Sequence, residues 1–134
     1  MDKKELFERD HYAAYLGVKV VDISKGSAVL SMDVVEHHLN FLGAAHGGAL
    51  FSLADMAFGL ASNSEQTVRV GIEAQMSYIE RVDAGERLLA TAHKVSENRR
   101  TAVYRVDVTR NNDIIAAFTG TVYITNRSFD QNPA

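Results

Sequence analysis

The chain has 134 residues, of which 46% are hydrophobic and 23% charged, and its formal net charge is -3. These values are typical of one globular domain with enough chain to bury a core, so we predict a single domain over residues 1–134. The slightly acidic balance argues against nucleic acid as a main partner. The sequence has no cysteine, which excludes disulfides, thiolate nucleophiles and cysteine-ligated metals.

The chain shows no pattern of export or membrane insertion. Its first five residues lack the apolar core of a secretory signal, and no apolar run approaches the roughly 20 residues that cross a bilayer. We therefore expect a cytoplasmic protein with no membrane partner.

The first third of the chain predicts a helical segment followed by two strands. Residues 1–16 have helical spacing and end before a glycine. Residues 18–24 and 27–35 alternate as strands, and residues 36–45 predict a loop. The candidate packing face of the helical segment consists of its large apolar side chains: Leu6, Phe7, Tyr12 and Leu16.

The stretch from His46 to Asn63 predicts a long helix that two glycines open. Apolar residues recur at three-four spacing over so wide an arc that we expect the helix to be buried nearly all round. Asp55 is its only fully charged residue, and a buried lone carboxylate is costly unless it is paired or used. The remaining small or polar residues form one narrow strip: Gly48, Ser52, Asp55, Gly59 and Ser62.

Four long strands joined by tight turns follow the helix. Alternation predicts them at 68–78, 88–95, 102–108 and 114–125, and residues 127–134 are predicted to be a frayed tail. Hairpins imply a mainly antiparallel sheet of about six strands, which can curl around a single helix. We therefore predict an α+β architecture whose element order matches the hotdog fold.

One face of this sheet is left to be covered. Several apolar side chains sit opposite the inward-facing residues, so we expect an oligomer. These residues are Ile79, Leu89, Val103, Ile115 and Tyr123.

The start of the central helix carries a family resemblance. The pattern is Asn40-x-x-Gly43-x-x-His46-Gly47-Gly48, followed by Leu53-Ala54-Asp55. From about residue 17 to 124 the chain closely resembles the hotdog-fold acyl-CoA thioesterases of the phenylacetate-degradation (PaaI-like) type. The resemblance implies hydrolysis of a coenzyme A thioester, of an aryl-acetyl or medium-chain acyl group, to free acid and CoA.

The resemblance also implies roles for the motif residues. Asp55 would be the nucleophile or general base, the Gly47 amide would polarise the thioester carbonyl, and His46 and Asn40 would position substrate or water. Elementary chemistry agrees, because a helix N-terminus offers free N–H donors, and glycine lets an oxygen approach them closely. No metal or other cofactor is required, since coenzyme A is part of the substrate.

A second group of residues is assigned to substrate binding. Gly48 lies beside the carbonyl site, and Asn63 would line the acyl pocket. Lys94, Arg99 and Arg100 lie near a hairpin, where they would hold the phosphates of coenzyme A. Basic residues at turns are also common as plain surface residues, and that interpretation stays open.

Several residues have structural alternatives. In the structural alternative, Asp55 is a carboxylate capped by its neighbours. His46 then only starts the helix, and Asn40 is an Asx-turn residue. Tyr78 is assigned to the core rather than to the acyl pocket. The adjacent His37-His38 pair has no spaced carboxylate partner, so we treat it as solvated and not as a metal site.

The spacing of Gly47 and Asp55 constrains the assembly. Eight residues along one helix separate them by about 12 Å, whereas reacting atoms must approach to about 3–3.5 Å. Two antiparallel copies of the helix would bring Gly47 of one subunit to Asp55 of the other. We therefore expect a homodimer with two shared sites, with stacking into a homotetramer as a further step.

Two other functions remain open at this stage. One is a hotdog hydratase or dehydratase acting on acyl thioesters, although the motif fits that type poorly. The other is a non-catalytic acyl-CoA-binding module, in which Asp55 would be dispensable.

Overall fold

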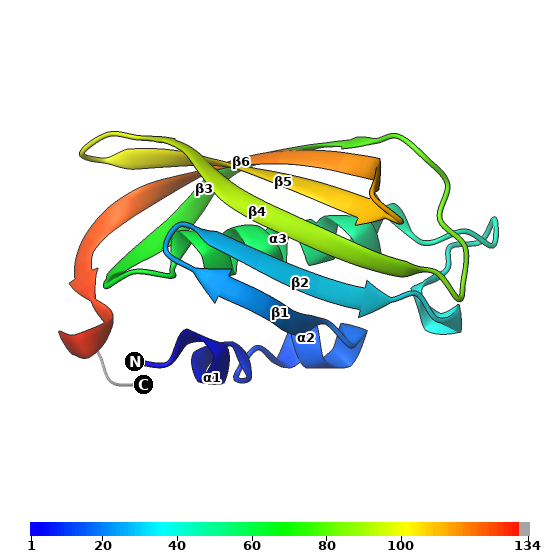
Figure 1. Cartoon of the computed structure of the whole chain (residues 1–134), viewed down its shortest axis with the longest axis horizontal. Coiled ribbons are helices and arrows are strands. Elements are labelled where there is room, and N and C mark those ends of the chain that lie inside the picture. Colours follow the sequence, from blue (N-terminus) through cyan, green and yellow to red (C-terminus); the bar gives the residue numbers. More distant parts are fainter. Residues whose placement is uncertain (132–134) are drawn as a thin grey trace.

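The computed structural model describes residues 1–131 as a six-stranded antiparallel sheet that curves around one long helix (Figure 1). The strand order is β1-β2-β4-β5-β6-β3. The strands are β1 (Lys19–Ser24), β2 (Ser27–Asp33), β3 (Thr67–Tyr78), β4 (Arg87–Glu97), β5 (Thr101–Arg110) and β6 (Asp113–Ser128). The helices are α1 (Lys3–Phe7), α2 (His11–Leu16) and α3 (Gly47–Ser62), with short 3-10 turns at Glu36–His38 and Phe129–Gln131. The predicted α+β hotdog architecture is confirmed.

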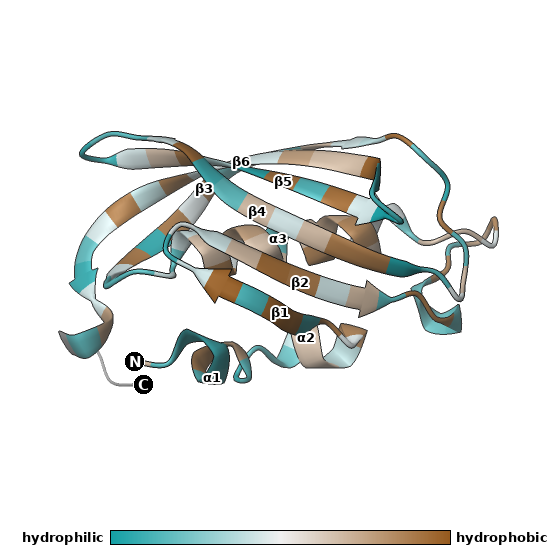
Figure 2. Ribbon diagram, in the orientation of Figure 1, coloured by the Kyte–Doolittle hydropathy of each residue, from teal (hydrophilic) through white to brown (hydrophobic). Residues whose placement is uncertain are grey.

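Helix α3 forms the core together with the concave face of the sheet. Leu53 and Ala57 on the helix are fully buried, as are Tyr104 and Phe118 on the strands. Figure 2 shows hydrophobic residues along α3 and the neighbouring strands, whereas α1 is largely hydrophilic. Position 120 on β6 has no room for a side chain, because a Cβ at Gly120 would lie 2.7 Å from the Phe58 ring.

The N-terminal segment differs from the prediction, since it forms two helices instead of one. Asp10 begins the second helix: its Oδ1 accepts a hydrogen bond from the Ala13 amide at 2.9 Å. Gly17 ends α2 in the left-handed region, with φ 77°. The packing role of Tyr12 is wrong, because this side chain is 55% exposed.

Helix α3 is buried nearly all round, as the apolar pattern predicts, except along the strip of small and polar residues. Gly48 and Asp55 are exposed, whereas Ser52 and Gly59 are half-buried. Ser62, the last residue of the predicted strip, is fully buried and donates to the Gly59 carbonyl. We call Gly48, Ser52, Asp55 and Gly59 the open strip of α3. The sheet therefore covers most of the helix and leaves this strip uncovered.

The outer face of the sheet carries most of the expected apolar side chains. Ile79 and Tyr123 are exposed, and Leu89 and Val103 are half-buried. Ile115 is the exception, because it is fully buried. The pairing passes from Val108–Ala116 to Thr109–Ile114, so Ile115 is an extra residue at a bulge, which reverses the alternation.

The C-terminal tail starts later than predicted. Strand β6 continues to Ser128, and the Phe129 amide donates to the Gln66 carbonyl at 2.9 Å. Residues 132–134 of the predicted tail lie outside the described residues. Within residues 1–131, no helix has the length and apolarity to span a membrane.

Candidate active site

The loop before α3 is shaped by its own polar side chains. Asn40 Oδ1 accepts hydrogen bonds from the amides of Leu42, at 2.9 Å, and Ala44, at 3.2 Å. His46 caps α3, because its Nδ1 accepts from the Gly48 amide at 2.8 Å. Both residues therefore have the structural roles that the sequence left open, and these roles fix the backbone on either side of Gly47.

Gly47 presents the free donor of this site. Within residues 1–131 no acceptor takes its N–H group, which lies at the positive end of the helix dipole. Its carbonyl accepts a hydrogen bond from the Tyr78 hydroxyl at 3.2 Å. Tyr78 is 54% exposed, so its assignment to the core is wrong. The amide can therefore donate to an incoming oxygen without losing a bond.

Asp55 is the carboxylate of the open strip. No hydrogen-bond donor or cation within residues 1–131 pairs with it, so Asp55 is not a carboxylate capped by its neighbours. Burial of its inner side raises the pKa of the Asp55 carboxyl, and the nearby charge of Asp10 raises this pKa further. The carboxyl is open to solvent on one side and faces a cavity on the other, which reconciles its exposure with its desolvation.

A cavity of about 290 Å³ lies beside Asp55. Its walls come from α1, from the loop before α2 and from the second half of α3. The lining residues are Lys3, Leu6, Phe7, Asp10, Asp55, Met56, Gly59, Leu60 and Asn63. Asp55 therefore stands where a mainly apolar cavity meets the open strip.

Asn63 lines this cavity but also holds the turn after α3. Its Nδ2 donates to the carbonyls of Gly59, at 2.9 Å, and Arg69, at 3.1 Å, and its Oδ1 accepts from the Arg69 amide at 2.8 Å. These bonds occupy the amide group. Asn63 can therefore contribute shape to the pocket more readily than a hydrogen bond to a substrate.

The three predicted basic residues do not form one group. Lys94 Nζ lies 2.8 Å from Glu97 Oε1 and 3.4 Å from Glu65 Oε2, so it is already paired with two carboxylates. Arg99 and Arg100 are exposed at the turn between β4 and β5, without an ion-pair partner among residues 1–131. A role in holding phosphates stays a prediction for all three.

His38 corrects another prediction, because it is buried and not solvated. Its Nε2 lies 2.9 Å from the Leu16 carbonyl, and its Nδ1 accepts from the Val35 amide at 3.1 Å. Burial lowers the pKa of its imidazole, which favours the neutral ring. In the described part of the chain, no group of three metal-ligating side chains forms.

Three residues beside Asp55 were missed by the sequence reasoning. Leu6 and Phe7 had been assigned to packing, and Asp10 had not been singled out. The only local signal was the spacing of Asp10 and Ala13, which marks a helix start. That spacing does not show which helix the segment packs against.

Comparison with known proteins places this arrangement in a family. A model of the thioesterase superfamily matches residues 42–117. A putative esterase from Archaeoglobus fulgidus is 37% identical over 128 residues, which cover 95% of this chain and 83% of that protein. The acyl-coenzyme A thioesterase PaaI of Escherichia coli is 34% identical over 116 residues, which cover 86% of this chain and 83% of that protein.

Solved structures agree with the sequence matches. The E. coli PaaI protein from the phenylacetic acid degradation operon superposes with a TM-score of 0.89 at 31% identity, covering 92% of this chain and 91% of that one. A Streptococcus mutans protein bound to acetyl-CoA superposes with a TM-score of 0.77 at 32% identity, covering 81% of this chain and 88% of that one. The curved sheet around α3 thus defines a hotdog-fold protein. The chain belongs to the thioesterase superfamily and is of the PaaI-like type, which confirms the predicted enzyme class, a thioester hydrolase.

Proposed function

We propose that the protein hydrolyses acyl-CoA thioesters, with an uncharged aryl-acetyl or medium-chain acyl group. The observation that carries this proposal is the unpaired Asp55 carboxylate on the open strip of α3, the helix that begins at the free Gly47 amide. Thioester hydrolysis needs a donor for the developing oxyanion and a group that activates water or attacks the carbonyl. The names of the PaaI relatives and the acetyl-CoA bound to the S. mutans neighbour support a CoA thioester as substrate.

The site requires a second subunit. Gly47 and Asp55 lie on one helix about 12 Å apart, so one chain cannot bring both to one carbonyl. Strand β3 offers the joining surface, because it ends the sheet and, among the strands of residues 1–131, pairs with β6 alone. Val70 and Ile72 on this strand are 47% and 58% exposed. An exposed apolar edge strand of this length is suited to pairing with a second copy.

In the proposed homodimer, the two β3 edges pair around a two-fold axis, and the open strips of the two α3 helices face each other antiparallel. Gly47 of the partner subunit then reaches the carbonyl beside Asp55. The small residues Gly48 and Gly59 permit the close approach. A homotetramer would further cover the apolar side chains of the outer sheet face, Ile79 and Tyr123 among them.

Two chemical routes use this geometry. In the general-base route, Asp55 takes a proton from water, the resulting hydroxide attacks the carbonyl carbon, and the C–S bond breaks to release CoA thiolate, which then takes up a proton. In the nucleophilic route, the Asp55 carboxylate attacks, CoA thiolate leaves, and water hydrolyses the mixed anhydride. The partner's Gly47 amide stabilises the oxyanion in both. No residue contact favours the hydratase or the binding-module alternative over these routes.

Release of free thiol from acetyl-, hexanoyl- and phenylacetyl-CoA tests the proposal. We expect turnover by the wild type and a loss of kcat of at least about 10³-fold in Asp55→Asn, because the base or nucleophile is removed. Asp33→Asn is the matched control, since this carboxylate is exposed on β2, away from the strip. Unchanged turnover in Asp55→Asn would remove Asp55 from the mechanism. Hydrated or unsaturated acyl-CoA in place of free thiol would favour a hydratase or dehydratase.

Two finer expectations remain predictions. One is a place in phenylacetate degradation, which the names of the PaaI neighbours support for those proteins. The other is a cytoplasmic location.

A further inference from the structure

Helix α1 lies against the part of α3 that carries Asp55. Leu6 and Phe7 from α1 face the shared cavity together with Met56 and Leu60 from α3. These four side chains form its apolar walls, and Gly59 leaves space between them, because a Cβ there would meet no atom within 4 Å. The N-terminal segment thus provides one wall of this cavity, which stays open to solvent on another side.

The position of α1 is fixed at its ends. Asp2 caps it, because its Oδ1 accepts from the Lys4 amide at 3.0 Å. The Lys3 ammonium lies 3.2 Å from the centre of the Phe129 ring, which ties the helix to the turn after β6. Asp10 follows the helix and is held by its bond to the Ala13 amide. The Lys3 contact therefore anchors the N-terminal end of the segment, and α2, whose Ala13 and Leu16 are buried, anchors the other end.

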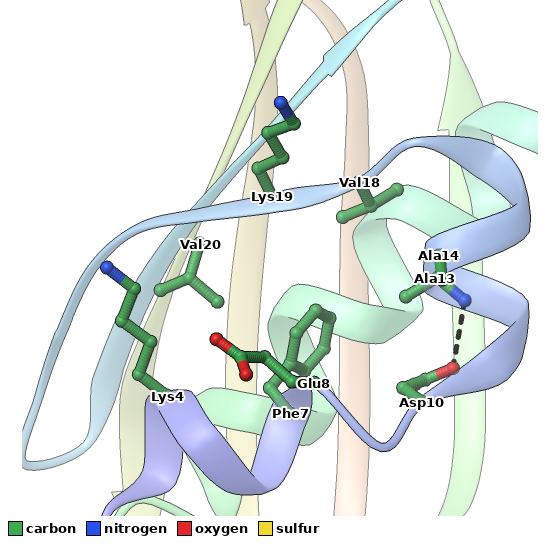
Figure 3. Close-up of a pocket in the computed structure, with 9 residues that line it drawn as sticks. All are labelled: Lys4, Phe7, Glu8, Asp10, Ala13, Ala14, Val18, Lys19 and Val20. Atoms are coloured by element: carbon green, nitrogen blue, oxygen red, sulfur yellow. Dashed lines mark hydrogen bonds between the residues drawn. The ribbon is translucent and has the colours of Figure 1, made fainter.

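Between these anchors, α1 packs loosely against the sheet. A second cavity, of about 370 Å³, separates α1 and α2 from β1, and Phe7 borders this cavity as well (Figure 3). Figure 3 shows the Phe7 ring on the side of α1 that faces β1, below Val20. The ring thus has space on two sides and can shift without a clash in the core.

We propose that α1 is the adjustable wall of the acyl pocket, and that Leu6 and Phe7 select the acyl group whose carbonyl lies at Asp55. This inference rests on the proposed function. The volume of about 290 Å³ lies at the lower end for small-molecule pockets and suits a ring or a short chain. The lining also carries two carboxylates, Asp10 and Asp55, and one cation, Lys3, whose ammonium lies over the Phe129 ring. This net negative charge disfavours acyl groups with a terminal carboxylate.

The selectivity of the enzyme between acyl groups tests whether Leu6 and Phe7 on α1 contact the acyl group. The readout is the ratio of kcat/KM for phenylacetyl-CoA to kcat/KM for acetyl-CoA. We expect Phe7→Ala to lower this ratio about 10-fold or more, because an apolar contact made only by the larger group is lost. Val20→Ala is the matched control: it borders only the second cavity and loosens the same helix from the other side. Equal ratios in the wild type and in Phe7→Ala would overturn the proposal.

A binding measurement separates this inference from the proposed function. The probe is S-(2-phenylethyl)-CoA, a thioether that cannot be hydrolysed, and CoA alone is the comparison. Phe7→Trp introduces the only tryptophan of the chain, and we expect its fluorescence to change with the thioether but not with CoA. We also expect Leu6→Ala to reduce the affinity for the thioether about 10-fold and that for CoA less than two-fold. If both ligands give the same response, α1 is not part of the acyl pocket, whether or not the protein is a hydrolase.

Discussion

Two carboxylates of the molecule, Glu97 and Asp55, respond to their surroundings in opposite ways. Glu97 on β4 lies 2.7 Å from Arg69 Nη1 and 2.8 Å from Lys94 Nζ. The hydrogen bond from Arg69, followed by that from Lys94, lowers the pKa of the Glu97 carboxyl to about 2. Asp55 on the open strip has no such partner and lies near a second carboxylate, Asp10, so its pKa is raised.

The difference separates a structural charge from a reactive one. Arg69 is buried, and its guanidinium also donates to the Tyr104 hydroxyl at 3.0 Å, so the cations and carboxylates around it neutralise one another. No cation among residues 1–131 neutralises Asp55. A carboxylate that folding leaves unpaired beside a cavity is better explained by chemistry than by stability.

The largest effect expected on α3, after loss of Asp55 itself, is that of losing the Gly47 amide. Gly47→Pro removes the N–H group and fits the backbone, because it is the first helical residue and His46, with φ -62° and ψ 135°, has the conformation favoured before proline. We expect kcat to fall about 10²- to 10³-fold, as for the loss of one oxyanion donor. Steady-state thiol release measures this.

Gly47→Ala is the control for that variant, since it keeps the N–H group. Its Cβ would lie 3.4 Å from the Tyr78 ring, an ordinary contact. If Gly47→Pro and Gly47→Ala have the same kcat, the amide does not stabilise the oxyanion.

The next largest effect is on stability. Removing the charge of Glu97 and removing that of Asp55 should change the stability in opposite directions. Because the pKa of Glu97 is lowered by folding, its stabilisation is present above its ordinary pKa of 4.5 and is lost as the pH falls through about 2. The side chain is 36% exposed, so we expect Glu97→Gln to reduce the free energy of unfolding at pH 7 by only about 1 kcal/mol. Urea unfolding at pH 7 and pH 3 measures it, with the exposed Glu80→Gln as control.

Asp55 should behave in the reverse way. Folding raises the pKa of its carboxyl, so the folded state is penalised as the pH rises from the ordinary value of 3.8 through the raised one. Asp55→Asn should therefore increase the Tm at pH 7, and the increase should vanish at a pH below 3.8. A lower Tm at pH 7 would show that Asp55 is a structural carboxylate after all.

The smallest effect is a shift in the pH profile. Asp10→Asn removes the charge that adds to the raised pKa of Asp55, and asparagine caps a helix as well as aspartate does. Activity requires the ionised Asp55, so the acid limb of kcat/KM against pH should move to lower pH in this variant. A limb that stays in place or moves to higher pH would contradict the role given to Asp10.

Much of the fold was accessible from sequence because strong periodic patterns coincide with its buried faces. The wide apolar arc of α3 and the alternation of the later strands predicted the curved sheet and its helix. Two of the errors arise where one residue interrupts a period. Ile115 was predicted on the outer face of the sheet, but the bulge turns it into the core. Asp10 begins a new helix and so divides the predicted N-terminal helical segment in two.

The site residues that lie in the sequence motif were predicted. Those that come together only in the folded chain were missed. Gly47 and Asp55 stand out through a helix start and a lone charge, and both signals are local. The contact of Tyr78 with Gly47 spans 31 residues, and the approach of Leu6 and Phe7 to Asp55 depends on how α1 docks. No spacing in the chain encodes those two contacts.

The central claim is that each site combines Asp55 of one subunit with Gly47 of the other, and subunit mixing tests it most directly. Asp55→Asn and Gly47→Pro subunits, each nearly inactive alone, are unfolded together and refolded as a mixture. Random pairing makes about half of the dimers mixed, and each of these regains one intact site of two, so we predict about one quarter of wild-type activity. A mixture no more active than its two parents would contradict a site shared between subunits.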